Sequence, residues 1–238
     1  MQLSEPNRIL QLDDATIGHI AAGEVVERPA QVVKELLENS LDAEAKRVVI
    51  TIERGGFDLI RIEDDGSGID ADDLPLALDR HATSKLKKRE DLNSIHTLGF
   101  RGEALASIGM VSALSIASRP SNTEGKRIVM DDGIKGSIEP FGMANGTRID
   151  VEHLFQNTPA RLAFQRRPAT ENACIVEVVV AHAMAHQAVA FRPVIAQRVV
   201  LHVPASEAMT ARLYDLIGGQ AEHMQELNAP QPKANAPR

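Results

Sequence analysis

The chain has very few of the residues that build disulfide frameworks or stack on nucleic-acid bases. Its 238 residues include one cysteine, Cys174, no tryptophan, one tyrosine and six phenylalanines. A single cysteine excludes an internal disulfide and a cysteine-rich metal site. So few aromatic rings argue against a stacking platform for single-stranded nucleic acid. There is also no apolar run of membrane-spanning length and no basic-then-apolar leader, so we expect a cytoplasmic protein with no membrane partner.

The overall charge and the missing catalytic motifs narrow the function further. The net charge is −7, so the field of the whole chain does not favour nucleic acid, and basic residues cluster only locally, at 85–89 and 161–167. Contact with DNA would then need a positive groove formed by assembly. The sequence has no G-x-x-x-x-G-K-[ST], no H-E-x-x-H and no G-x-S-x-G. P-loop nucleoside triphosphatases, zincin proteases and α/β-hydrolases are therefore excluded.

A polar pair on an amphipathic segment is the first candidate site. Residues 29–43 alternate apolar and polar residues with helical spacing, and Pro29 fits the first helical turn. Glu35 and Asn39 are four residues apart, so a helix places both side chains on one face. The carboxylate can take a proton from water, and the amide oxygen can bind a hard cation. An ordinary solvated helix face is the alternative, although Asn39 is a weak helix former at mid-helix.

The rest of the chain mixes helical segments with strands of alternating polarity. Asp14 can cap a short helix that stops at Gly23. Gly55-Gly56 and Asn145-Gly146 are typical of hairpin turns. Because strict alternation of strand and helix is absent, the predicted fold class is α+β. We expect further helices at 74–81, 104–110 and 171–187, a long loop at 82–102, and strands at 48–52, 57–64, 112–118, 126–130, 147–151 and 190–203.

An acidic, glycine-containing segment follows the predicted strand 57–64. Asp64 shares a strand face with Ile60 and Ile62, which directs its carboxylate toward an apolar pocket where it needs a donor partner. The exocyclic amine of adenine is one such donor. Gly66 and Gly68 remove side chains beside it, so that a flat ring can approach the backbone. An Asp-Gly turn after a strand is the common alternative.

Two later segments have features of a nucleotide site. Gly99 and Gly102 precede the predicted helix at 104–110, and backbone N–H groups at such a junction can hold a phosphate. A plain loop-to-helix junction is the alternative. In the second of these segments, Thr147 follows the predicted Asn145-Gly146 turn, and its hydroxyl can lie near a bound base.

Taken in order, these motifs resemble the four ATP-site motifs of the GHKL superfamily, and the likeness is far closer to the MutL family of DNA mismatch repair proteins. It spans about residues 9–205 and continues weakly to 227. The resemblance implies a Bergerat-type ATP-binding fold, a two-layer sandwich in which helices cover a mixed, mainly antiparallel sheet. The segments that look most like the MutL family are AAGEVVERP at 21–29, RHATSK at 80–85, LGFRGEALASI at 98–108 and NTPAR at 157–161.

The resemblance also implies a role for each motif. Glu35 would be the general base that activates the hydrolytic water, and Asn39 would bind a Mg²⁺ ion that bridges the phosphates. Asp64 would accept from the adenine amino group, with Gly68 and Thr147 lining the base pocket. The lid would include Thr83, Ser84 and Lys85, and the phosphate loop would comprise Gly99, Phe100, Arg101, Gly102, Glu103, Ala104 and Leu105.

The same resemblance suggests an ATP-operated switch. In MutL-like proteins, ATP orders the lid and an N-terminal arm and closes an N-terminal homodimer. A MutS-type mismatch recognition protein and DNA are partners of the full-length protein. We expect an arm at 1–13, an ATPase domain over 1–205, the start of a second domain at 206–227 and a disordered tail at 228–238.

Two departures from the family pattern affect these expectations. The family usually has Asn where this chain has Asp65, which adds a carboxylate near the cation. The family's second domain donates a lysine to the γ-phosphate, and we expect that lysine to be missing here, so hydrolysis should be slow. A nucleotide-binding scaffold or dimerisation piece without turnover is one alternative. A histidine kinase-like phosphotransferase is another, although no segment upstream of Glu35 resembles a phosphoacceptor helix.

Overall fold

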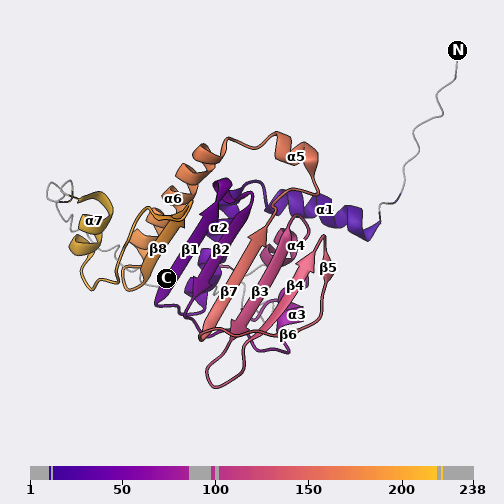
Figure 1. Cartoon of the computed structure of the whole chain (residues 1–238), viewed down its shortest axis with the longest axis horizontal. Helices are drawn as coiled ribbons and strands as arrows, with labels where there is room; N and C mark the ends of the chain where they lie inside the picture. Colours follow the sequence, from indigo (N-terminus) through magenta and orange to yellow (C-terminus); the bar gives the residue numbers. More distant parts are fainter. Residues whose placement is uncertain (1–10, 12, 86–97, 100–101, 219–220, 222–238) are drawn as a thin grey trace, which may run out of the picture.

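A single mixed sheet organises the chain, and helices pack against one of its faces (Figure 1). The computed structural model describes residues 11, 13–85, 98–99, 102–218 and 221. The helices are α1 (Asp14–Val25), α2 (Pro29–Asp42), α3 (Leu74–Ala77), α4 (Ala104–Gly109), α5 (Pro159–Ala163), α6 (Pro168–Ala185) and α7 (Met209–Ile217), with a 3₁₀ turn at Arg54–Gly56. The strands are β1 (Arg47–Glu53), β2 (Leu59–Asp64), β3 (Ala113–Arg119), β4 (Lys126–Asp131), β5 (Ile134–Lys135), β6 (Glu139–Pro140), β7 (Gly146–Glu152), β8 (Ala190–Ile195) and β9 (Arg198–Val199).

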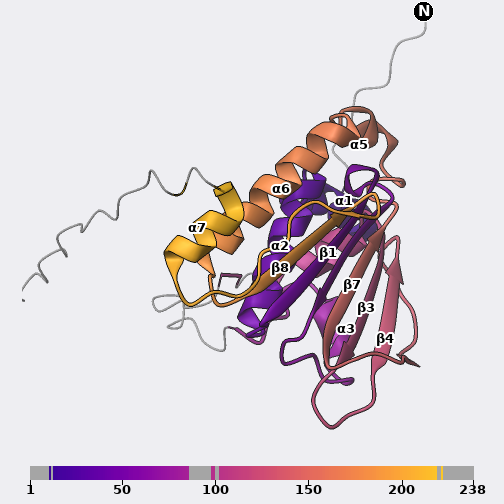
Figure 2. The same ribbon diagram turned by 60° about the vertical axis from the view of Figure 1, so that its left-hand side comes forward.

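The strand order is β5-β4-β3-β7-β2-β1-β8-β9, with β6 paired to β4. Among the described strands, β1 and β8 pair in parallel, and the other pairings are antiparallel. Figure 2 shows α2 and α6 lying together behind the sheet. The structure therefore confirms the predicted α+β class and the two-layer arrangement of a mixed, mainly antiparallel sheet covered by helices.

The core lies between the sheet and its helical layer. Alternate residues of β1 and β2 point into it, including Ile50 and Ile60, which are completely buried. Leu36 and Leu37 of α2 and Val179 of α6 meet them from the other side. The apolar stripe of α2 thus faces the sheet.

Helix α2 and the β1–β2 hairpin form as the sequence predicts. Pro29 is the first residue of α2, and Arg28 before it is extended, as expected for a residue that precedes proline. The hairpin turn takes the form of the 3₁₀ turn, in which Gly55 has a φ of 72°. This positive φ is readily adopted by glycine.

Helices α1 and α3 have boundaries that differ from the predicted ones. Helix α1 is capped by the side chain of Asp13, which accepts from the Thr16 N–H at 2.6 Å, and it runs through Gly23 to Val25. A Cβ on Gly23 would lie 1.9 Å from Nη2 of Arg161, so a side chain there would displace the guanidinium group of Arg161. Helix α3 stops at Ala77, short of the predicted end at His81, and His81 itself has a φ of 63°, outside the helical region.

The predicted Asn145-Gly146 hairpin turn is also wrong. Gly146 is already the first residue of β7, which pairs with β2 and β3 in the middle of the sheet. The preceding strand β6 pairs with β4 instead. The chain therefore crosses from the edge of the sheet to its centre at this point. Strands β5 and β6 and helices α5 and α7 were not predicted.

Helix α7 lies within the segment that the sequence assigns to a second domain. Its Arg212 is fully buried and donates to the backbone carbonyls of Gln187 and Val189. These bonds hold α7 beside the loop between α6 and β8. The domain boundary near residue 205 remains a prediction. Within the described residues, none of the helices combines the length and apolar character that crossing a membrane requires.

Candidate functional site

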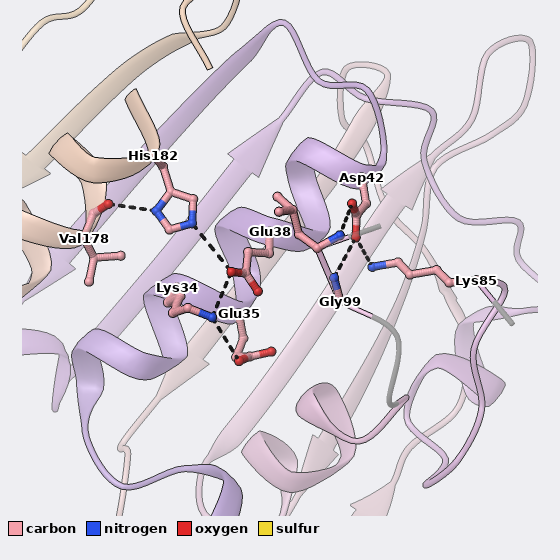
Figure 3. Close-up of polar contacts among 9 residues, drawn as sticks. Lys34, Glu35, Glu38, Asp42, Lys85, Gly99, Val178 and His182 are labelled. Carbon is pink, nitrogen blue, oxygen red and sulfur yellow. Dashed lines mark hydrogen bonds and ion pairs between the residues drawn. The ribbon is translucent and has the colours of Figure 1, made fainter. Parts of the chain in front are cut away.

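The polar face of α2 carries a row of charged groups (Figure 3). Lys34 Nζ lies 2.8 Å from Glu38 Oε1 and 3.8 Å from Glu35 Oε1. The hydrogen bond to Glu38 raises the pKa of Lys34. His182 of α6 approaches the same Glu38 oxygen, with 3.9 Å between Nε2 and Oε1. The Glu35 side chain is 28% exposed.

Asn39 and Asp42 of α2 meet a lysine from a distant part of the chain. Lys85 Nζ donates to Asn39 Oδ1 at 2.9 Å and to Asp42 Oδ2 at 2.5 Å. The two carboxylate oxygens of Asp42 also accept from the backbone N–H groups of Leu98 at 3.0 Å and Gly99 at 3.2 Å. We call Asn39, Asp42, Lys85, Leu98 and Gly99 the Lys85 cluster. It joins the predicted cation ligand, the lid lysine and the start of the phosphate loop.

A second group of polar contacts surrounds Asp64 at the end of β2. Its Oδ2 accepts from the Ser40 hydroxyl at 2.8 Å, and its Oδ1 accepts from the N–H groups of Gly66 at 2.9 Å and Thr147 at 3.2 Å. Burial raises the pKa of Asp64. The hydrogen bonds from Ser40, Gly66 and Thr147 lower it, and the charge of Asp65 raises it, but burial has the largest effect. We call Ser40, Asp64, Gly66 and Thr147 the Asp64 cluster.

Thr147 is held beside Asp64 by the sheet itself. The two residues are paired across β2 and β7, and Thr147 is buried. Its hydroxyl lies 3.3 Å from that of Ser118, which also accepts from the Ile69 N–H at 2.7 Å. Gly146 has a φ of 119°, and a Cβ there would lie 1.9 Å from the Asp64 carbonyl oxygen. A side chain at Gly146 would therefore force β2 and β7 apart.

The structure gives Gly66 and Gly68 roles that differ from the predicted ring approach. A Cβ on Gly66 would lie 2.7 Å from the Ala43 carbonyl oxygen. A Cβ on Gly68 would lie 2.8 Å from the Pro120 nitrogen, and its φ is 78°. Both glycines are therefore required by close backbone packing beside Asp64. Contact of Gly68 with a base remains a prediction.

The segment that leads into the predicted lid contacts the predicted phosphate loop. Gly102 accepts from the His81 N–H at 2.9 Å, and its φ of 62° fits the close approach of Ala82. Thr83 Oγ1 accepts from the Lys85 N–H at 3.1 Å, whereas Ser84 is exposed.

Helix α4 begins at Ala104, as predicted, and its next residue is Leu105. Glu103 precedes it without a side-chain cap and lies 3.3 Å from His81 Nδ1. Phe100 and Arg101 fall outside the described residues. The structure thus brings Asn39, Lys85 and Gly99 together at one place and Asp64 and Thr147 at another.

Three polar residues of the site were not among the predicted site residues. Asp42 had a weak signal, since it continues the polar stripe of Glu35 and Asn39 by one turn. Ser40 and Ser118 had none beyond being small polar residues. Their importance follows from contacts with residues that are 24 and 29 positions away in the sequence.

The Lys85 cluster also fits a hard cation. Asn39 and Asp42 present an amide and a carboxylate oxygen to one positive group, and such oxygens are the ligands that Mg²⁺ prefers. Among the described residues, no group of three or more His, Cys, Asp and Glu side chains could hold a metal ion. A cation here would therefore need oxygens from a phosphate or from water in addition.

Comparison of the sequence with known proteins identifies the relatives of this chain. The sequence model of the "Histidine kinase-, DNA gyrase B-, and HSP90-like ATPase" family matches residues 27–139. The DNA mismatch repair protein MutL of Symbiobacterium thermophilum is 48% identical over 212 residues, which cover 89% of this chain and 33% of the relative. MutL of Azotobacter vinelandii is 48% identical over 223 residues, covering 92% and 35%. The chain thus spans about a third of the length of these relatives.

Solved structures agree. The MutL ATPase domain of Aquifex aeolicus, complexed with ADP, is 32% identical and superimposes with a TM-score of 0.65 over 81% of this chain and 69% of its own. The N-terminal domain of a DNA repair protein superimposes with a TM-score of 0.73 at 25% identity, covering 86% and 61%. The chain therefore belongs to the MutL family of DNA mismatch repair proteins and has the GHKL-type ATPase fold of that family's ATPase domain.

Proposed function

We propose that this chain is the Mg²⁺-dependent ATP-binding and ATP-hydrolysing module of a mismatch repair protein. The observation that carries the proposal is the arrangement of two polar clusters along the C-terminal half of α2. Ser40 belongs to the Asp64 cluster, while Asn39 and Asp42 belong to the Lys85 cluster. One helix thereby links an acceptor suited to a base with groups suited to a cation and phosphates.

The adenine ring is assigned to the Asp64 cluster. The Asp64 carboxylate accepts from the exocyclic amine of the base, and the buried Thr147 lies beside it. A neutral donor on the ligand suits this carboxylate, because burial already disfavours its charge. A base with a carbonyl oxygen at that position would meet a second acceptor and bind poorly. The site is therefore proposed to select adenine over guanine.

The phosphates are assigned to the Lys85 cluster and the loop that starts at Gly99. Asn39 holds the Mg²⁺, which would supply positive charge to the phosphate oxygens. The Lys85 side chain would add a second positive charge near the phosphates. Thr83, Ser84 and residues 99–105 are proposed as the other residues around the phosphates. Glu35 is four residues before Asn39 on the same helix face and takes the proton from the attacking water.

The wider behaviour of the module is proposed from its family. ATP binding orders a lid around residues 83–85 and drives N-terminal dimerisation with a second copy. A MutS-type protein and DNA are proposed as partners of the whole protein, in the cytoplasm. We propose slow hydrolysis for residues 1–238 alone, since the family resemblance assigns a γ-phosphate lysine to a second domain. A nucleotide-binding scaffold without turnover is the second candidate.

Calorimetric titration with a non-hydrolysable ATP analogue, with and without Mg²⁺, tests the proposal. Binding should be saturable, strengthened by Mg²⁺ and much weaker for the GTP analogue. A titration without heat or saturation would refute nucleotide binding altogether. If binding occurs, phosphate release from ATP at saturating concentration separates the slow ATPase from the scaffold, because only the ATPase gives turnover above the protein-free rate.

A further inference from the structure

Asp65 lies where the end of α2 meets the end of β2. Its Oδ1 accepts from the backbone N–H groups of Lys46 and Arg47, each at 2.8 Å. Its own N–H donates to the Arg47 carbonyl at 3.4 Å, directly after Asp64, the last residue of β2 that pairs with β1. The family usually has Asn at this position. The Asp65 carboxylate therefore fastens the start of β1 to the residue that follows β2.

A second contact joins the same two parts of the chain. We call residues 43–47, which connect α2 to β1, the α2–β1 connection. The Ser67 N–H donates to the Ala43 carbonyl at 2.9 Å, and a Cβ on Gly66 would lie 2.7 Å from that carbonyl oxygen. The loop after β2 is thus bonded to the α2–β1 connection on both sides of Gly66, through Asp65 and through Ser67.

We propose that Asp65 is a positioning residue for base recognition, because it holds the α2–β1 connection against the loop that surrounds the Asp64 carboxylate. The inference rests on the proposed function, which assigns the adenine amine to Asp64. Two of the donors to Asp64 are tied to the segments that Asp65 joins. Gly66 follows Asp65 directly, and the Ser40 carbonyl accepts from the Ala45 N–H of the connection at 3.2 Å. Without the bonds of Asp65, both donors should be held less firmly and the carboxylate should be less well oriented for the base.

Asp65 also brings a negative charge next to Asp64, which asparagine would not. Burial is the largest cause of the raised pKa of Asp64, and the charge of Asp65 raises it further. Among the described residues, the other groups that face Asp64 are uncharged, namely Ser40 of α2, Val48 of β1, Gly66 and Thr147. The ionised form of Asp64 accepts from adenine, so the charge of Asp65 should restrict adenine binding to higher pH. Asparagine would keep an oxygen for the two backbone donors and lessen this restriction.

Calorimetric titration of Asp65→Ala and Asp65→Asn with adenosine, at several pH values, tests the inference. Asp65→Ala leaves two backbone N–H groups without their acceptor and should weaken binding about fivefold or more at neutral pH. Asp65→Asn should bind as the wild type does at neutral pH. The pH at which its affinity falls should be lower than in the wild type by about half a unit, a modest shift because Asp65 is exposed to solvent. Asp72→Ala and Asp72→Asn, at another exposed aspartate, are the matched controls and should follow the wild type in both measurements.

Tripolyphosphate with Mg²⁺, which lacks the base, should bind every variant as it binds the wild type. Unchanged adenosine affinity in Asp65→Ala, an equal loss for tripolyphosphate, or the same pH dependence in Asp65→Asn and the wild type would each overturn the inference.

Titration of the Asp64 carboxyl carbon, followed by NMR in the nucleotide-free protein, repeats the pH comparison without a ligand. Its midpoint should be lower in Asp65→Asn than in the wild type, and equal midpoints would overturn the inference. This measurement decides the matter if thermal unfolding shows that Asp65→Ala is not folded. Failure of the wild type to bind adenosine and the ATP analogue would instead refute the proposed function, and the NMR titration would still report whether Asp65 acts on Asp64.

Discussion

The Asp64 cluster and the Lys85 cluster lie next to each other on α2 but are built from different kinds of contact. Two of the three donors to Asp64 are backbone N–H groups, and Thr147 is placed by strand pairing. Asp42, by contrast, is held by a lysine side chain and by backbone groups from a separate segment. The first cluster is therefore fixed by the sheet, whereas the second depends on an ion pair between segments.

This difference suggests a division of labour in the proposed function. A backbone-built cluster is preorganised, so base recognition requires little rearrangement. An ion pair can be exchanged for another pair of charges with modest change in the fold, so the Lys85 cluster is the part that can respond to a cation and phosphates. Variants in the two clusters should therefore affect different steps.

The largest expected effect is on turnover and should leave both clusters intact. Glu35→Ala should reduce ATP hydrolysis by about 10²- to 10⁴-fold, the usual contribution of a general base. Nucleotide affinity should change little, because neither cluster includes Glu35. Phosphate release and analogue titration measure the two effects separately. Glu38→Gln, one position from Asn39 on α2, is the neighbouring control, and a loss of affinity in Glu35→Ala would contradict the assigned role.

The next effect should appear in affinity and be confined to the base. Asp64→Asn should weaken binding of the ATP analogue about 100-fold, since it removes the charge of the acceptor and, with its one oxygen facing the two backbone N–H groups, leaves an amide donor in place of Oδ2. Tripolyphosphate with Mg²⁺, which lacks the base, should bind the variant as it binds the wild type. Equal losses for both ligands would show that the two clusters are not independent and would break the comparison.

Local patterns predicted the Asp64 cluster better than they predicted the Lys85 cluster. The alternation along β2 placed Asp64 on the face of Ile60 and Ile62, and this placement agrees with the partly buried carboxylate in the structure, whose pKa is raised by burial. Periodicity likewise predicted the common face of Glu35 and Asn39. These features depend on residues within one turn or one strand, so a sequence pattern can encode them.

Contacts between distant segments could not be predicted, because no local sequence pattern encodes them. Lys85 follows Asp42 by 43 positions, and no local period relates the two. The misplaced Asn145-Gly146 turn has the same origin, because the pairing of β7 with β2 and β3 is decided by the whole sheet. Turn chemistry alone could not distinguish a hairpin from a crossing of the sheet.

A smaller effect is expected in the pH dependence of adenosine binding, which depends on the Asp64 cluster alone. Burial raises the pKa of Asp64, so its carboxylate becomes protonated at a higher pH than an ordinary aspartate. Adenine affinity should be complete above that folded-state pKa and fall as the pH decreases through it, because a protonated carboxyl no longer offers the same acceptor. The ratio of adenosine affinities of wild type and Asp64→Asn, measured across pH, isolates this group since asparagine does not titrate. A constant ratio would contradict the assignment. From the same shift, the contribution of Asp64 to folding stability should rise as the pH falls.

The smallest effect tests how far the Asp64 cluster is preorganised by a side chain rather than by backbone. Ser40→Ala removes the 2.8 Å hydrogen bond to Asp64 Oδ2 and leaves both backbone donors on Oδ1. We expect adenosine binding to weaken about 3- to 10-fold, the worth of one hydrogen bond. Ser112→Ala is the matched control, because Ser112 is also buried but donates to the Ile108 carbonyl away from the site. Calorimetry on both variants, with thermal unfolding to compare their stabilities, gives the answer. A loss as large as that of Asp64→Asn would mean that the serine, and not the strand pairing, holds the carboxylate in place.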